Sequence, residues 1–248
     1  MSEVPEVSEI FAAPETGGEL AGPEEAPQPT VLFETVIVAS LAVAVLALFI
    51  FAWLGNEMLQ GDTRQFDQAV RGWVHQFASP GMTRTMTAIS LLGYNVLILE
   101  MLIAFAFFAW LRWRRAAAWL AVTMIGSLAL DAALKYAYHR LRPVAFFGVA
   151  PHSYSFPSGH ALCSFCFYGV LAGLLSARTK ALSWRVVIWT VAAILVIAIG
   201  LSRIYLGVHY PSDVLGGYLA AAVWVGTVIV LDHVRKVRRE SRSENRKR

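Results

Sequence analysis

Charged residues are scarce in this sequence, and their scarcity argues against a soluble protein. Only 15% of the 248 residues are charged, whereas 57% are hydrophobic. Soluble domains have an apolar share nearer to about 45–50%. The composition therefore argues against a soluble domain and indicates that most of the chain lies in a membrane.

Cysteine is nearly absent as well. Cys163 and Cys166 lie three positions apart within one apolar stretch, and no second pair of cysteines or histidines lies within reach. This excludes a disulfide framework and argues against a zinc site. We expect both thiols to be ordinary packing residues.

Long apolar runs are what the chain has instead. Windows of about 20 residues with few charges predict six transmembrane helices. Their approximate ranges are 31–54, 88–111, 116–137, 158–176, 185–202 and 213–232. We therefore expect an all-α integral membrane protein in which residues 31–234 form one six-helix bundle.

The two ends of the sequence carry opposite charge. Residues 1–30 contain seven Glu and no Lys or Arg, whereas residues 235–248 contain eight basic residues. We expect the acidic, proline-rich leader to be disordered. Because no basic segment precedes the first apolar run, we expect no cleavable signal peptide.

The basic residues also predict the orientation in the membrane. Residues 112–115 and 178–185 hold three basic residues each, and both connections fall on the same side as the basic tail if the spans alternate. Cytoplasmic connections are enriched in Lys and Arg. We therefore expect both termini in the cytoplasm, and we interpret the tail as a topology signal and not as a nucleic-acid site.

The first outer connection contains an amphipathic pattern near residues 62–78. The letters DTRQ at 62–65 resemble a capping box, and Pro80 ends the pattern. Apolar residues follow at helical spacing: Phe66, Val70, Trp73, Val74 and Phe77. We expect a helix on the outer leaflet that buttresses the bundle, with a lipid gate as the less favoured alternative.

Three polar segments are expected to meet at the outer face of the bundle. One segment follows the third span, at 135–143, and a second opens the fourth span, at 157–160. The third segment, 202–213, connects the last two spans. In an alternating bundle all three segments lie on the same side of the membrane, where ionisable groups mark a functional site.

The first chemistry that these segments suggest is anion binding. Lys135, Arg142 and Arg203 supply three positive charges, two of them guanidinium groups suited to paired phosphate oxygens. Ser158 and Gly159 lie where a helix begins, so we expect backbone N–H groups there to face the same anion. The pattern predicts a phosphate site.

Two histidines add the groups needed for phosphoryl transfer. His209 and His160 come from different segments and could flank a phosphorus atom. Asp213, four residues after His209, could accept a hydrogen bond from one ring nitrogen and leave the other to attack. We expect His160 to protonate the leaving oxygen.

The three segments resemble a known signature. KYAYHRLRP, PSGH and SRIYLGVHYPSD together resemble the three-part motif of the type 2 phosphatidic acid phosphatase superfamily. The resemblance covers about residues 88–232 and implies the same six-helix fold. It also implies these site residues: Lys135, Arg142, Ser158, Gly159 and Arg203 for phosphate, His209 as nucleophile, Asp213 as its partner and His160 as acid.

The resemblance further implies an activity. Membrane members of this family hydrolyse lipid phosphates and pyrophosphates without a metal or other cofactor. Undecaprenyl pyrophosphate is our first expectation, in the plasma (inner) membrane of a bacterium with the site facing outward. Phosphatidylglycerophosphate, phosphatidic acid and lipid A are the alternatives. The expected partners are the lipid substrate and the bilayer, with no nucleic acid and with the oligomeric state left open.

Two other functions are compatible with parts of the pattern. Vanadium haloperoxidases resemble the same signature, but they are soluble, so the six spans argue against that activity. A lipid or anion transporter would use the cations but would not need His209 and Asp213.

Other polar residues carry weaker predictions. Asp131 precedes Lys135 by four positions and is expected to pair with it. Glu100 lies within the second span, so we expect it to face the bundle interior and make a structural hydrogen bond. Three more side chains are expected either to touch a lipid head group or to be solvated: His139, Arg140 and His152.

Overall fold

The structure is a computed structural model that describes residues 29–93, 95–149 and 151–245. The chain divides into two compact units, Met1–Val36 and Ile37–Arg248. Of the first unit, only residues 29–36 are described, and they are helical. The predicted leader therefore lies almost entirely outside the described residues, and the candidate transmembrane helices belong to the second unit.

Helices account for all the regular secondary structure in the described residues, in agreement with the all-α prediction. Their bounds are α1 (Pro29–Gln60), α2 (Arg64–His75), α3 (Pro80–Leu91), α4 (Asn95–Trp110), α5 (Arg114–Tyr138), α6 (Gly159–Ser176), α7 (Leu182–Tyr205) and α8 (Pro211–Asn245). The basic tail continues α8 as far as Asn245.

Five helices are long and apolar enough to cross a membrane, among the residues described. They are Val38–Gln60 of α1, α5, α6, α7 and Pro211–Arg238 of α8. A sixth span arises only if α3 and α4, which are bent by 42° relative to each other, are counted together. The second predicted span, 88–111, is therefore a broken helix pair and not one straight helix.

Gly93 lies at this break, and its lack of a side chain allows close packing. A Cβ atom at Gly93 would lie 2.5 Å from Ile199 Cγ2 and 3.0 Å from His160 Cδ2. Both distances are shorter than ordinary van der Waals contact. The break thus brings the end of α3 directly against α6 and α7.

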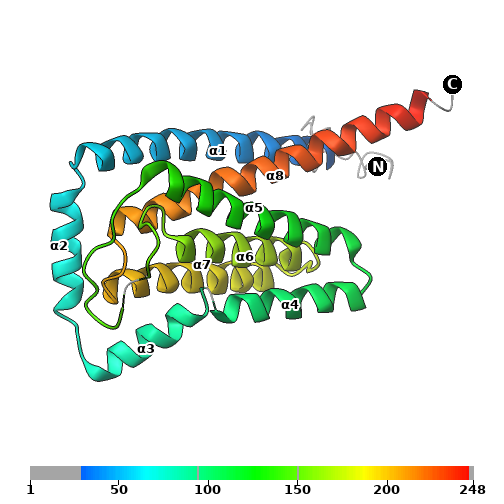
Figure 1. Ribbon diagram of the computed structural model, residues 1–248. Helices are drawn as coiled ribbons and strands as arrows, with labels where there is room; N and C mark the ends of the chain where they lie inside the picture. The colour runs from blue at the N-terminus through cyan, green and yellow to red at the C-terminus, as the bar shows by residue number, and fades with distance from the viewer. Residues whose placement is uncertain (1–28, 94, 150, 246–248) are drawn as a thin grey trace, which may run out of the picture. The chain divides into compact units, whose positions relative to one another are not determined.

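The helix α6 is the centre of the bundle and packs on α5, α7 and α8 (Figure 1). Its small and apolar side chains, including Ala161, Cys163 and Cys166, are almost completely buried. Both cysteines are free thiols, as expected for packing residues. A second close contact joins α5 to α8, because Gly126 leaves room for the Trp224 ring.

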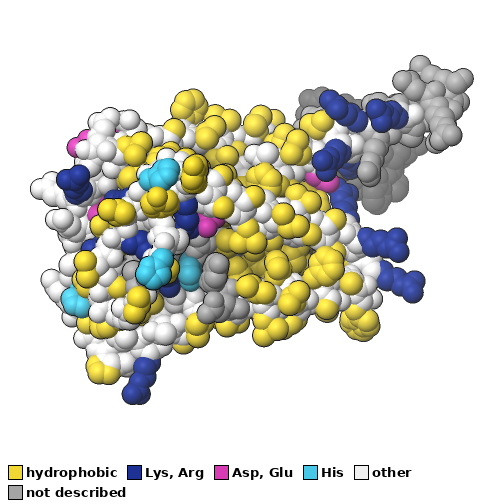
Figure 2. Space-filling view, viewed as in Figure 1, with side chains coloured by type: hydrophobic (Ala, Val, Ile, Leu, Met, Phe, Trp, Pro, Cys, Tyr) yellow, Lys and Arg dark blue, Asp and Glu magenta, His cyan; other side chains and the backbone are white. Residues whose placement is uncertain are grey.

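The outward surfaces of the helices remain apolar. Large side chains such as Phe49, Trp184 and Ile194 are exposed. Figure 2 shows hydrophobic side chains over much of the visible face along which the helices run. Since lipid is the solvent for such a surface, this pattern fits a membrane-embedded bundle.

The connections between the spans lie at two opposite ends of the bundle. The α4–α5 and α6–α7 connections lie at one end, and the α5–α6 and α7–α8 connections lie at the other (Figure 1). The helix α2 runs across this second end and packs on α7 and α8. The three motif segments therefore come together beside α2.

Candidate active site

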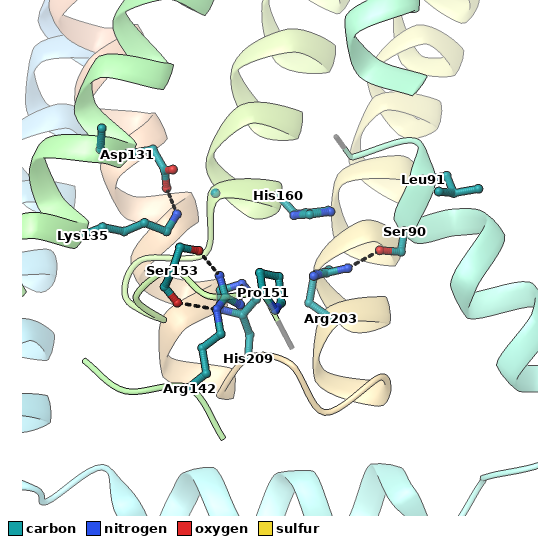
Figure 3. Close-up of a pocket in the computed structure, with 12 residues that line it drawn as sticks. Ser90, Leu91, Asp131, Lys135, Arg142, Pro151, Ser153, His160, Arg203 and His209 are labelled. Atoms are coloured by element: carbon teal, nitrogen blue, oxygen red, sulfur yellow. Dashed lines mark hydrogen bonds and ion pairs between the residues drawn. The ribbon is translucent and has the colours of Figure 1, made fainter. Parts of the chain in front are cut away.

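The motif segments surround one cavity of about 680 Å³. Six of the eight predicted site residues line it, namely Lys135, Arg142, Gly159, His160, Arg203 and His209. The remaining lining residues are Ser90, Leu91, Asp131, Ala132, Pro151 and Ser153. In Figure 3, Lys135 and Asp131 lie on one side of this cavity and Arg203 and Ser90 on the other.

His209 is buried, with 1% of its surface exposed, and both ring nitrogens have partners. Its Nδ1 lies 3.3 Å from Asp213 Oδ2 and its Nε2 lies 2.9 Å from Arg142 Nη1. Because a guanidinium only donates, Nε2 accepts and the ring proton lies on Nδ1, facing Asp213. Burial lowers the pKa of His209 to about 4, so the ring is neutral at neutral pH.

Asp213 lies behind His209 and is fully buried. Its Oδ2 also accepts from the Tyr210 N–H at 2.8 Å and from the Ser155 hydroxyl. Its Oδ1 accepts from Arg140 Nη1 at 2.5 Å. These donors fix the carboxylate in the orientation that faces the imidazole.

Arg142 links the loop before α6 to the loop before α8. Its guanidinium donates to the Ser153 carbonyl at 2.7 Å and to the Val208 carbonyl at 2.9 Å, besides contacting His209. Burial lowers the pKa of Arg142, but from 12.5, so the group stays charged. Arg142 therefore carries its charge next to His209 Nε2.

The other two cations lie on either side of the cavity. Lys135 donates to Asp131, as the spacing predicted, and Arg203 donates to Ser90 of α3. Arg203 is 8% exposed, and its Nε has no hydrogen-bond partner among the described residues. A buried, unpaired guanidinium N–H is costly unless an anion accepts from it.

Gly159 and Ser158 differ in their relation to the cavity. Gly159 begins α6, and a Cβ there would lie 2.9 Å from Asp131 Oδ1 and 3.0 Å from Lys135 Nζ. Ser158 does not line the cavity, and its N–H, expected to be unpaired, donates to the Asp213 carbonyl at 2.9 Å. Its buried hydroxyl has no partner in the described part of the chain.

The structure adds polar residues that no motif marks. Ser90 and Ser153 contact the predicted arginines, and Ser155 contacts Asp213. Ser90 lies in α3, and Ser153 and Ser155 lie in the loop before α6. None of these serines has a distinctive spacing, so the sequence offered no signal for them. Among the side chains with weaker predictions, Glu100 accepts from Tyr168 at 2.7 Å, which is the structural hydrogen bond expected of it.

The sequence predicts that Arg140 either touches a lipid head group or is solvated, and the structure places it in neither position. Its side chain is 11% exposed and is paired with Asp213 and Asp67, so it neither lies in solvent nor lines the cavity. His139 packs on the Tyr154 ring, and His152 is exposed. No group of three or more His, Cys, Asp or Glu side chains suited to a metal ion occurs among the described residues.

Comparisons with known proteins identify the family of the chain. The PAP2 superfamily model matches residues 116–236, which include all three motif segments. Phosphatidylglycerophosphatase B of Bacillus subtilis is 32% identical over 157 residues, which are 61% of this chain and 76% of that protein. The undecaprenyl-diphosphatase of Sulfolobus acidocaldarius is 30% identical over 125 residues, 48% of this chain and 56% of that protein.

A solved structure extends the similarity to the fold. The crystal structure of a transmembrane PAP2-type phosphatidylglycerolphosphate phosphatase from Bacillus subtilis matches with a TM-score of 0.70. The match has 26% sequence identity and covers 77% of this chain and 96% of that one. The similarities of sequence and of fold thus agree, and the chain belongs to the PAP2 superfamily as an integral membrane lipid phosphatase.

Proposed function

We propose that this protein releases phosphate from a membrane lipid through a phosphohistidine formed on His209. The observation that carries this proposal is the arrangement of the His209 ring. It is neutral, its Nδ1 proton faces Asp213, and its Nε2 accepts from Arg142, one of the three cations that line the cavity. A buried neutral imidazole oriented by a carboxylate is an activated nucleophile.

In the first step, His209 Nε2 attacks phosphorus and the bond from phosphorus to the lipid oxygen breaks. The bonding electrons pass to the leaving oxygen, which takes a proton from His160. The imidazole becomes a cation, and its Nδ1–H donates to Asp213 throughout. The products of this step are the dephosphorylated lipid and phosphohistidine.

In the second step, water attacks phosphorus and gives a proton to His160. The bond between phosphorus and Nε2 breaks, inorganic phosphate leaves and His209 is again neutral. Lys135, Arg142 and Arg203 hold the phosphate oxygens in both steps. Arg142 donates a hydrogen bond to Nε2 in the structure. Before the attack, this N–H must donate to a phosphate oxygen instead, which frees the Nε2 lone pair.

The lining of the cavity supports lateral access from the bilayer. Ser90 and Leu91 of α3 line the cavity on one side, and Asp131 and Ala132 of α5 line it on another (Figure 3). Leu91 is 44% exposed, so apolar surface continues from the cavity to the side of the bundle. We infer that acyl chains stay in the membrane while the phosphate reaches His209.

Phosphatidylglycerophosphate is the substrate that we place first. The relative of which this chain covers 76% is named phosphatidylglycerophosphatase B. Undecaprenyl pyrophosphate, our expectation from the sequence, is second. The three cations that line the cavity favour it, because they could hold two linked phosphates. A second relative is named undecaprenyl-diphosphatase.

The proposed location is the plasma (inner) membrane of a bacterium, with the site at the outer face. Basic residues support this orientation, because the connections at 112–115 and 178–185 lie at the end opposite the site (Figure 1). Positive charge accumulates on the cytoplasmic side. Both termini would then be cytoplasmic.

The test is phosphate release by the purified protein in detergent with EDTA. The lipids are phosphatidylglycerophosphate, undecaprenyl pyrophosphate, phosphatidic acid and lipid A, each assayed with wild type, His209→Ala and His152→Ala. We expect release by wild type and by the exposed-loop control His152→Ala only, with the fastest rate on phosphatidylglycerophosphate. Release that persists in His209→Ala would contradict the proposed nucleophile, and wild type inactive on every lipid would contradict the substrate class.

A further inference from the structure

A buried carboxylate of α2 lies next to the candidate site although no motif includes it. Asp67 is fully buried and lies outside the 116–236 segment that the family model matches. It accepts from Arg140 Nη2 at 2.7 Å, from the Ser212 hydroxyl at 2.7 Å and from the Ser212 N–H at 3.0 Å. A buried charge with this many donors has a defined orientation.

Arg140 connects this carboxylate to the one behind His209. Its Nη1 donates to Asp213 Oδ1 at 2.5 Å and to the Ser212 hydroxyl at 2.7 Å. Its guanidinium also lies over the Tyr210 ring, 4.2 Å from the centroid. Four side chains therefore form one continuous chain of contacts: Asp67, Arg140, Asp213 and His209.

The charges of these four groups favour a cation on His209. With neutral His209, two carboxylates and one guanidinium sum to one negative charge. When His209 becomes cationic during phosphoryl transfer, the sum is zero. In a buried site of low dielectric, such compensation is worth more than it would be in water.

Asp67 is not the only residue that attaches α2 to the bundle. Arg71, one turn further along α2, donates to the Val144 carbonyl at 2.8 Å and to the Gly207 carbonyl at 3.3 Å. It also lies 4.6 Å from the Phe146 ring centroid. These contacts hold α2 against both loops, so the buried ion pair of Asp67 requires an additional explanation.

We propose that Asp67 and Arg140 are positioning residues that hold Asp213 against His209 and stabilise the cationic imidazole. Arg140 fixes Asp213 Oδ1 so that Oδ2 faces the ring, and Asp67 with Ser212 fixes Arg140. The inference rests on the proposed function, since it assigns these residues a role in phosphoryl transfer at His209. It makes α2 part of the catalytic unit as well as a buttress.

The experiment compares Asp67→Asn, Arg140→Met and the double variant with wild type. We expect kcat to fall by about 10- to 100-fold in each single variant, because misplaced groups cost rates of this order, while KM changes less than about threefold. Since Asp67 acts through Arg140, the double variant should be no slower than Arg140→Met alone. If the two residues had independent structural roles, the fold-losses in kcat of the two single variants would instead multiply in the double variant.

A pH profile separates positioning from mere structural support. Removing the charge of Asp67 disfavours protonated His209, so the acid limb of kcat/KM should move to lower pH in Asp67→Asn. A purely structural role would reduce the amount of folded protein and leave the limb in place. Charged and titratable groups surround His209 and its network on several sides. They are Asp67, Arg71, Lys135, Arg140, Arg142, His160, Arg203, Tyr210 and Asp213.

Matched controls use exposed residues of the same type. Asp62→Asn and Arg64→Met make the same changes of charge near the start of α2 and should leave kcat and the acid limb unchanged. If Asp67→Asn does not elute as a monodisperse species, Ser212→Ala removes two hydrogen bonds of the network and keeps every charge. It should lower kcat severalfold.

The outcomes distinguish this inference from the proposed function. Active wild type, inactive His209→Ala and a slow Asp67→Asn with a shifted limb would support both. Active wild type and inactive His209→Ala, with Asp67→Asn and Ser212→Ala as fast as wild type, would overturn the positioning role alone. An active His209→Ala would overturn the function on which the inference depends.

Discussion

Burial determines the chemistry of individual residues at this site. His209 is removed from water and lies between Asp213 and Arg142, and burial outweighs the attraction of the carboxylate. The ring therefore stays neutral in a range where an exposed histidine would titrate. In the proposed mechanism, this keeps the Nε2 lone pair available to attack phosphorus.

The pH dependence of the reaction should reflect this burial. His209 must be neutral to attack, so the acid limb of kcat/KM should lie near the value of about 4 that burial gives its pKa. Activity should be lost as the pH falls through that value and retained above it. The measurement is kcat/KM against pH for wild type and His160→Ala. Because His160 must be protonated to donate, wild type should also lose activity at high pH, and His160→Ala should not. An acid limb at about 6.5 would contradict the buried neutral imidazole of His209.

The geometry of Arg142 should matter as much as its charge. A lysine at this position could not reach the carbonyls of Ser153 and Val208 and His209 Nε2 simultaneously. Arg142→Lys should therefore lower kcat/KM on the order of 100-fold, measured as phosphate release at subsaturating lipid. Arg64→Lys, an exposed change of the same type, should have no effect. Equal activity of Arg142→Lys and wild type would show that charge alone suffices.

The sequence predicts some of these residues and not others for a physical reason. His160, Arg203 and His209 lie within short segments whose spacing is visible along the chain. Ser90 contacts Arg203, and Asp67 contacts Arg140 and Ser212, from helices that are distant in sequence. Contacts of this kind depend on how helices pack, and one sequence carries no record of that packing.

At the scale of elements, the break between α3 and α4 has the clearest consequence. Hydropathy identifies an apolar segment at 88–111 but cannot show where its helix bends. Gly93 at the break allows close approach to Ile199 and His160, and the end of α3 then brings Ser90 to Arg203. The broken span thus supplies one wall of the cavity.

Adding a methyl group at Gly93 should disturb this wall. Gly93→Ala would place Cβ at 2.5 Å from Ile199 Cγ2, an overpacking that costs about 1–3 kcal/mol of stability. We expect a lower thermal midpoint in detergent and a reduced kcat, because His160 also lies within 3.0 Å of the added atom. Gly81→Ala in α3 meets no atom within 4 Å and is the control. If the two variants have equal midpoints, the break is not tightly packed.

At the scale of the whole molecule, charge along the chain predicts orientation. Hydropathy and the positions of basic connections can be recognised from the order of residues alone. The sequence could therefore predict the all-α bundle and the common end of the three motifs. The structure agrees on both points. Which end faces the cytoplasm depends on a membrane that surrounds the protein, and it therefore needs a direct test.

Cysteine labelling in intact cells can supply that test. Cys163 and Cys166 are buried, so wild type should not react with a membrane-impermeant maleimide. His152→Cys lies in the exposed loop at the site end, and Lys180→Cys lies in the exposed α6–α7 connection. The proposed orientation predicts labelling of His152→Cys from outside and of Lys180→Cys only after permeabilisation. The opposite pattern would place the site in the cytoplasm.

The central claim is that His209 carries the phosphoryl group, and trapping that group is the most direct measurement. Wild type would be mixed with phosphatidylglycerophosphate for a short time, quenched in alkali and digested for mass spectrometry. The mechanism predicts a phosphate on the peptide containing His209, stable in alkali, released by acid and absent from His209→Ala. Turnover in which the phosphate is found on another residue, or on none while product accumulates in a burst, would contradict it.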